Sequence, residues 1–165
     1  MPGVAEQRVL GLDVAQVALV VRDLDAALVQ WTALGYGPWR VYRYGDNLKR
    51  RRYRGGDGSF SMLLAVSDGS PQLELVQPIS GPSIYEDWLT ERGEGLHHVG
   101  LVVEDDFDAA VQRLVDAGFP VIQAGDFGPN HDGRFSYHDT QAALGVIVEL
   151  VRDCTGSSEP LRVVG

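Results

Sequence analysis

Two apolar runs in which alternate side chains share a face give this chain a repeated pattern. The segment Val17–Asp23, with the sequence VALVVRD, returns as Val99–Asp105, with the sequence VGLVVED. Five of the seven positions are identical. Each run is rich in β-branched residues, which predicts a buried strand, and each ends in an Asp suited to cap a following helix. The pattern therefore predicts an internal duplication.

An amphipathic helix is predicted after each of these strands. Apolar residues at helical spacing form one stripe in each half: Leu24, Ala27, Leu28 and Trp31, then Phe107, Ala110, Val111 and Leu114. Both predicted helices stop at a glycine that precedes an aromatic residue, which is a common signal for a helix C-terminus. These glycines are Gly35 and Gly118.

Strand-like segments repeat behind each helix as well. The segment Gly58–Ser61 matches Gly133–Ser136, and Leu73–Val76 matches Val148–Val151. Each half therefore predicts a strand, a helix and three further strands: 14–22, 24–34, 38–45, 59–66 and 72–78, then 96–104, 106–117, 120–124, 133–139 and 145–152. The linker 79–95 contains a short helix that is capped at Ser83 and runs through Leu89.

The fold class that these elements predict is α+β. Two βαβββ modules, about 14–78 and 96–152, are expected to form one curved, cup-shaped mixed sheet with helices on its outer face. A chain of 165 residues fits a single domain of this kind.

Composition narrows the location and the partners. No apolar run approaches the roughly 20 residues that span a membrane, and Met1–Arg8 lacks the basic and apolar regions of a secretory signal. The single cysteine, Cys154, excludes an internal disulfide and a thiolate-rich metal site. We therefore expect a cytoplasmic protein. Its net charge of -9 disfavours nucleic acid and membranes as partners.

One segment runs against the acidic balance. Five of the fourteen basic residues fall within six positions: Lys49, Arg50, Arg51, Arg52 and Arg54. One interpretation is a solvated strand or loop, and the other is a mouth that recruits an anionic ligand. On the second interpretation Arg51 and Arg52 are candidates for substrate binding.

Strand alternation places four polar residues on the face away from the helices. If Val17 and Val99 pack under the helices, Gln16 and His98 face the other way. Glu74 and Glu149 follow the same rule on the last strand of each module. The repeat thus superposes Gln16 on His98 and Glu74 on Glu149. His97 alternates onto the helix-covered face, where it is expected to be a packed residue.

If the two modules curl into one open cup, these four side chains converge and could hold a metal ion. Three oxygen donors and one imidazole suit a divalent Mn, Co, Ni, Fe or Zn ion. The alternative is a pair of solvated glutamates, a structural histidine and a lining glutamine. His138, which shares a strand with Ser136, is a further candidate for lining the cup.

Several of these segments resemble the vicinal oxygen chelate superfamily, which includes glyoxalase I, methylmalonyl-CoA epimerase and the bleomycin-resistance proteins. They are Val20–Ala27, Leu34–Trp39, Gly93–Val99 and Val148–Leu150, and the run Gly95-Leu96-His97-His98 is most similar to the epimerases. The resemblance implies metal ligands at Gln16, Glu74, His98 and Glu149. It also brings the catalytic glutamate of the family near Ser61, where a serine cannot act as the same base.

The same resemblance implies a function. It favours a metal-dependent isomerase that works through an enediolate on an acyl-CoA-type small molecule, with Glu149 as the base and Glu74 as a second proton-transfer candidate. The four ligand types are similar to those of some glyoxalase I enzymes, so a lactoylglutathione lyase is an alternative. A non-enzymatic protein that binds a small molecule or antibiotic is another. A homodimer is expected in each case.

Overall fold

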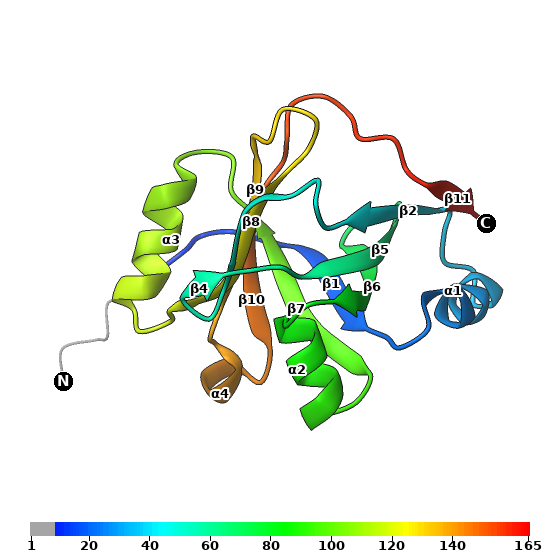
Figure 1. The fold of residues 1–165 in the computed structure, drawn as a ribbon, viewed down its shortest axis with the longest axis horizontal. Coiled ribbons are helices and arrows are strands. Elements are labelled where there is room, and N and C mark those ends of the chain that lie inside the picture. The colour runs from blue at the N-terminus through cyan, green and yellow to red at the C-terminus, as the bar shows by residue number, and fades with distance from the viewer. Residues whose placement is uncertain (1–8) are drawn as a thin grey trace.

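The computed structural model describes residues 9–165, which form one mixed sheet of eleven strands with helices on both of its faces (Figure 1). Met1–Arg8, on which the expectation of no secretory signal rests, lies outside the described residues. Across residues 9–165, none of the helices has the length and apolar character that a membrane crossing needs.

Both modules have the predicted order of one strand, one helix and three strands. The first consists of β1 (Val14–Val20), α1 (Leu24–Ala33), β2 (Trp39–Tyr44), β5 (Ser61–Ser67) and β6 (Gln72–Ser80). The second consists of β7 (Gly95–Val102), α3 (Phe107–Asp116), β8 (Val121–Phe127), β9 (Gly133–His138) and β10 (Ile147–Arg152). The α+β fold class predicted from the sequence is confirmed.

The two modules join at the centre of the sheet. The strand order is β11-β2-β5-β6-β1-β7-β10-β9-β8-β3-β4. The first strands of the modules, β1 and β7, pair with each other in antiparallel fashion, whereas β1 with β6 and β7 with β10 are parallel. The repeated segments therefore lie side by side about a local two-fold relation.

Each module helix begins at an aspartate cap. The Asp23 side chain accepts a hydrogen bond from the Ala26 N–H at the start of α1. At the start of α3 the capping residue is Asp106, which accepts from the Ala109 N–H, and the prediction of Asp105 was wrong by one position. Two consecutive aspartates, Asp105 and Asp106, lie between β7 and α3, and the helix begins after Asp106.

Helices α1 and α3 cover the outer face of the sheet, as predicted. Leu24 and Leu28 of α1 pack against Trp39, Val41 and Leu75 of the first module. On the other module, α3 packs through its own apolar stripe onto the outward side chains of β10. Burial of these apolar side chains is the main contribution to holding each helix in place.

A third helix, α2 (Ile84–Glu91), lies on the inner face instead. Its four apolar residues pack against inner-face side chains of both modules: Ile84, Tyr85, Trp88 and Leu89, against Val20, Phe60, Val76 and Tyr137 among others. The prediction that this face carries no helix was therefore wrong for α2. The linker helix covers one part of the cup and buries its apolar residues there.

Four small elements lie outside the predicted set. The basic run forms β3 (Lys49–Tyr53), which turns into β4 (Gly56–Asp57) and pairs with β8 of the second module. A short helix, α4 (Gln141–Leu144), precedes β10. After β10 the chain crosses back to the first module, where β11 (Arg162–Val164) pairs with β2 and forms the edge of the sheet (Figure 1).

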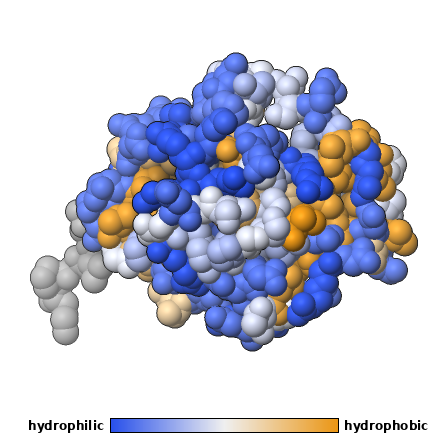
Figure 2. Space-filling view, viewed as in Figure 1, coloured by the Kyte–Doolittle hydropathy of each residue, from blue (hydrophilic) through white to orange (hydrophobic). Residues whose placement is uncertain are grey.

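Large apolar side chains stay exposed at the end of the molecule where α1 and β11 lie. They are Val29, Leu34, Leu161 and Val163. Figure 2 shows apolar residues gathered at the right of the view, the end at which Figure 1 places these two elements. The homodimer expected from the sequence stays a prediction.

Candidate functional site

His98 and Glu74 lie in one row across the centre of the inner face. In the strand pairing Ala18 of β1 stands opposite Glu74 of β6 on one side and opposite His98 of β7 on the other. Ala18 is wholly buried, and its methyl group leaves space for the longer side chains on both flanks. The small residue between them allows the two functional groups to lean toward each other.

Gln16 and Glu149 lie in the adjacent row. Gly100 of β7 stands opposite Gln16 of β1 and opposite Glu149 of β10. A Cβ atom at Gly100 would lie 3.1 Å from Gln16 Oε1 and 3.4 Å from Glu149 Oε2. Both oxygens thus reach over the glycine toward the same point, and a side chain at that position would compete with anything bound there.

The two rows meet in a buried pair. His98 Nε2 lies 3.3 Å from Glu149 Oε2, and the side chains are 0% and 6% exposed. Apart from this contact, neither atom has a hydrogen-bond partner. Buried polar atoms are nearly always fully satisfied, so a close pair with no further partner indicates a place for a bound group.

The electrostatics of the site favour protonation of the Glu74 carboxylate in the metal-free protein. Burial raises the pKa of Glu74 to about 8, and the nearby Glu149 adds to the shift while His98 opposes it. Burial by itself lowers the pKa of His98, but the carboxylates of Glu149 and Glu74 outweigh it, so the pKa of His98 is raised. Burial also lowers the pKa of His97 well below its ordinary value.

The metal-free protein should therefore lose stability as the pH rises. Because the pKa of Glu74 is raised from 4.5 to about 8, the folded state binds more protons than the unfolded state between these values. The raised pKa of His98 acts with the same sign. The lowered pKa values of His97 and His138 act with the opposite sign, but only up to about the ordinary histidine value of 6.5. We therefore expect the melting temperature of chelator-treated protein to fall between about pH 7 and about pH 8.5, and Glu74→Gln to flatten this fall. A melting temperature that rises over the same range in the native protein would contradict the assignment.

The residue types at this site fit a divalent ion. Carboxylate and amide oxygens with one imidazole nitrogen are ligands for Mn, Fe, Co, Ni or Zn. Among residues 9–165, no three His, Cys, Asp or Glu side chains are already arranged to hold a metal. The part of a ligand set that is already in place consists of the His98–Glu149 pair and the Gln16 oxygen beside it. A full set needs Glu74 to turn toward the pair, or a substrate oxygen.

A cavity of about 390 Å³ adjoins the pair. Gln16, Glu74 and Glu149 form part of its lining, and most of the rest is apolar or aromatic: Tyr42, Tyr44, Leu48, Met62, Leu64, Val66, Val102, Phe127, Phe135 and Val151. The rings of Tyr42 and Tyr44 stack with centroids 6.2 Å apart. Within the part of the chain that the structure describes, the lining contains no lysine or arginine.

The structure does not bring the remaining predicted site residues to this cavity. Ser61 Oγ lies 2.7 Å from Ser80 Oγ, and its neighbour Met62 is the one that lines the cavity. His138 is buried, with Nδ1 2.9 Å from the Phe119 carbonyl oxygen and Nε2 3.1 Å from Ser136 Oγ. Its role as a lining residue has no support in this geometry.

Arg51 and Arg52 are held by neighbours of their own hairpin. Arg51 donates to the Phe60 carbonyl oxygen at 2.8 Å, and Arg52 donates to Asp57 at 2.8 Å. Arg50 and Arg54 are likewise paired, with Asp126 and Asp87. The basic run thus ties β3 to its surroundings, and any recruitment of an anionic substrate by Arg51 and Arg52 would require these contacts to open.

Two tyrosines at the site were not predicted. Tyr85 of α2 and Tyr137 of β9 both line the cavity, and the Tyr85 hydroxyl donates to the Tyr137 oxygen at 2.7 Å. Tyr137 also packs edge-on against the His98 ring. Alternation along β9 could have placed Tyr137 on the inner face with Phe135, but Tyr85 depends on where α2 docks.

Comparison with known proteins identifies a family for this chain. A family model described as the glyoxalase/bleomycin resistance protein/dioxygenase superfamily matches residues 15–137. No curated protein matches the sequence.

Solved structures match over most of the chain. The structure of methylmalonyl-CoA epimerase from Mycobacterium tuberculosis is 27% identical, covers 87% of this chain and 88% of its own, and has a TM-score of 0.60. A Streptomyces coelicolor methylmalonyl-CoA epimerase in complex with 2-nitronate-propionyl-CoA is 22% identical, with 87% and 99% covered and a TM-score of 0.62. A hypothetical protein from Bacillus halodurans is 16% identical, with 91% and 100% covered and a TM-score of 0.61. The latter two show the fold alone.

Proposed function

The chain belongs to the glyoxalase/bleomycin resistance protein/dioxygenase superfamily, and on this premise we propose that it is a metal-dependent isomerase that moves a proton next to a carbonyl group. The observation that carries the proposal is the buried His98–Glu149 pair beside the cavity, whose facing atoms have no further hydrogen-bond partner. An acyl-CoA-type thioester is the proposed substrate, supported by the likeness to a methylmalonyl-CoA epimerase at 27% identity.

The ligands of the ion would be His98, Glu149, Glu74 and Gln16. A divalent ion bound by them would stabilise the negative charge that develops on a substrate carbonyl when the neighbouring C–H proton leaves. Glu149 would take that proton, since its carboxylate is at the cavity wall and its Oε2 has no other hydrogen-bond partner. Glu74 lines the same cavity and is the second candidate for carrying a proton.

The cavity indicates which part of a substrate it would receive. Apart from the carboxylates and amides near the pair, and from Asp153, Cys154 and Ser158, its walls are apolar or aromatic, and it contains no basic side chain among the described residues. A CoA moiety with its phosphates would therefore remain outside, while an acyl group enters. A neutral, apolar acyl group would match this lining better than a free acid, whose only counter-charge would be the ion.

A glyoxalase-type lyase is the second candidate. It is favoured by the ligand types, because two glutamates, one glutamine and one histidine resemble the set of some glyoxalase I enzymes. The same proton transfer would serve a hemithioacetal of glutathione. The two candidates differ in substrate and share the site.

The proposal is tested without knowledge of the physiological reaction. Protein loaded with Co²⁺ and mixed with an acyl-CoA in D₂O should incorporate deuterium at the α-carbon, as followed by NMR or mass spectrometry. A panel of propionyl-, methylmalonyl- and phenylacetyl-CoA covers small, acidic and aromatic acyl groups. Addition of a chelator should stop the exchange, because the developing charge loses its main stabilisation.

The other outcomes are informative. Turnover of a glutathione hemithioacetal without exchange of any thioester would favour the lyase. Binding of an apolar ligand by metal-free protein, with no exchange and no metal uptake, would overturn the proposal in favour of a binding protein.

A further inference from the structure

A bulge in β7 turns two consecutive histidines toward the same side of the sheet. The pairing of β1 with β7 shifts between Ala18 opposite His98 and Leu19 opposite Leu96, so His97 has no partner of its own. An extra residue in one strand breaks the alternation of side chains. The His97 ring therefore lies among α2 and inner-face residues, with ring centroids 5.1 Å from Trp88 and 5.2 Å from Tyr85. The expected packed histidine is confirmed, but its predicted face was wrong.

The two imidazoles contact each other directly. His97 Nδ1 lies 2.8 Å from His98 Nδ1, and both residues are at most 1% exposed. One of these nitrogens must carry a hydrogen and the other must accept it. The second nitrogen of His97, Nε2, lies 3.4 Å from the carbonyl oxygen of Ile84. A carbonyl oxygen can only accept, so a hydrogen on His97 Nε2 satisfies this contact and leaves His97 Nδ1 as the acceptor.

We infer that His97 is a positioning residue that fixes the tautomer of His98. In this arrangement the hydrogen between the rings belongs to His98 Nδ1, which leaves His98 Nε2, 3.3 Å from Glu149 Oε2, as the nitrogen that an ion would bind in place of a proton. Histidines that bind metals commonly donate their other ring N–H to an acceptor that sets the tautomer and the ring orientation. Here that acceptor is a second imidazole. The inference rests on the proposed function in so far as His98 is a ligand.

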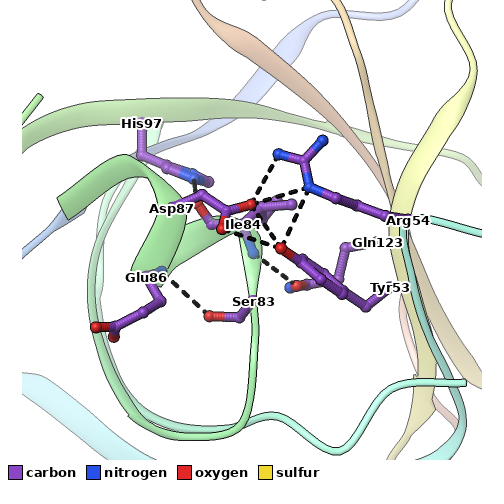
Figure 3. A network of polar contacts seen from close by, with 8 residues as sticks. All are labelled: Tyr53, Arg54, Ser83, Ile84, Glu86, Asp87, His97 and Gln123. Carbon is purple, nitrogen blue, oxygen red and sulfur yellow. Dashed lines mark hydrogen bonds and ion pairs between the residues drawn. The ribbon is translucent and has the colours of Figure 1, made fainter. Parts of the chain in front are cut away.

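The Ile84 carbonyl group, which contacts His97 Nε2, is itself held in place by a network of hydrogen bonds (Figure 3). The Ile84 N–H donates to the buried Gln123 Oε1 of β8 at 3.0 Å, which fixes the first turn of α2 to the second module. One turn along, Asp87 accepts from the Tyr53 hydroxyl at 2.8 Å and from the Arg54 guanidinium at 2.7 Å. The basic hairpin thus helps to hold α2, and α2 holds His97.

The matched pair His97→Asn and His97→Gln separates this role from simple packing. The Asn oxygen can occupy the place of Nδ1 and accept from His98, whereas the longer Gln side chain reaches the place of Nε2 and offers no acceptor beside His98. Both replace a buried ring by a smaller amide, so both should lower the melting temperature. Only His97→Gln removes the acceptor beside His98, so only this variant should weaken metal binding by His98.

Binding of Co²⁺ alone, measured by calorimetry, is the first readout. We expect His97→Gln to bind Co²⁺ about 10- to 100-fold more weakly than the native chain, and His97→Asn to stay within about threefold of it. Equal affinity of His97→Gln and the native chain, or equal losses in both variants, would overturn the inference.

The second readout uses metal-free protein and does not depend on the proposed function. Long-range ¹H–¹⁵N NMR spectra should show a hydrogen on His98 Nδ1 in the native chain and in His97→Asn, whether or not Nε2 also carries one, and partial loss of that hydrogen in His97→Gln. A native His98 in the Nε2–H tautomer would refute the role of His97 even if the ion binds. Native protein that shows the expected tautomer but takes up no Co²⁺ would instead refute the proposed function.

Discussion

Glu149→Gln is expected to lower the rate of α-proton exchange by about 100- to 10,000-fold, the range in which a positioned general base contributes to proton transfer. The amide has the shape of the carboxylate and can still offer an oxygen, but it cannot accept the proton. Glu149 is the suitable position, because its Oε2 faces His98 Nε2 at 3.3 Å and its side chain reaches the cavity wall. Exchange into propionyl-CoA in D₂O measures the effect.

Glu74→Gln is the matched control for this substitution. Glu74 occupies the position of the first module that corresponds to Glu149 and lines the same cavity. If Glu149 is the base, Glu74→Gln should reduce exchange far less than Glu149→Gln at saturating Co²⁺. Equal losses would mean that the two carboxylates share the proton, and an unaffected Glu149→Gln variant would remove Glu149 from the mechanism. The metal content of both variants shows whether a loss of exchange comes from loss of the base or from loss of a metal ligand.

The repeat in the sequence carried most of what could be predicted about the site. Two copies of one strand that pair about a local two-fold axis bring equivalent positions together at the centre of a sheet. Gln16 and His98 are such equivalent positions. In the observed pairing Gln16 stands opposite Gly100, and His98 stands opposite Ala18. Alternation then fixed which side chains face inward, and it did so correctly for all four residues. Period-two alternation is a local property, so it can be read from the chain.

What the sequence did not reveal depends on contacts between distant segments. The bulge at His97 arises where β1 and β7 must both pair and curve, and no local pattern marks the extra residue. The apolar stripe of α2 is visible in Ile84, Tyr85, Trp88 and Leu89, yet its docking on the inner face follows from the surface left open by α1 and α3. The basic run was ambiguous for the same reason, because its partners Asp87 and Asp126 belong to other elements.

Gly100→Ala is expected to remove metal binding with little damage to the fold. The added Cβ would lie 3.0 Å from Gln16 Cβ, 3.1 Å from Gln16 Oε1 and 3.4 Å from Glu149 Oε2. A methyl group at that point separates two of the proposed ligand oxygens. Loss of a partner outside the ligand shell costs about 10- to 100-fold in metal affinity, so obstruction between the ligands should cost roughly 100-fold or more.

The effect on stability should be much smaller than the effect on binding. Overpacking by one methyl group costs about 1–3 kcal/mol, and alanine is intrinsically better than glycine in a strand, which offsets part of that cost. Gly11→Ala provides the control, since a Cβ there meets nothing within 4 Å and the backbone at Gly11 needs no left-handed conformation. Calorimetry with Co²⁺ and thermal melts of both metal-free variants test the prediction. Native affinity in Gly100→Ala would show that the ion, if bound, lies away from the point between Gln16 and Glu149, and the ligand assignment would have to be withdrawn.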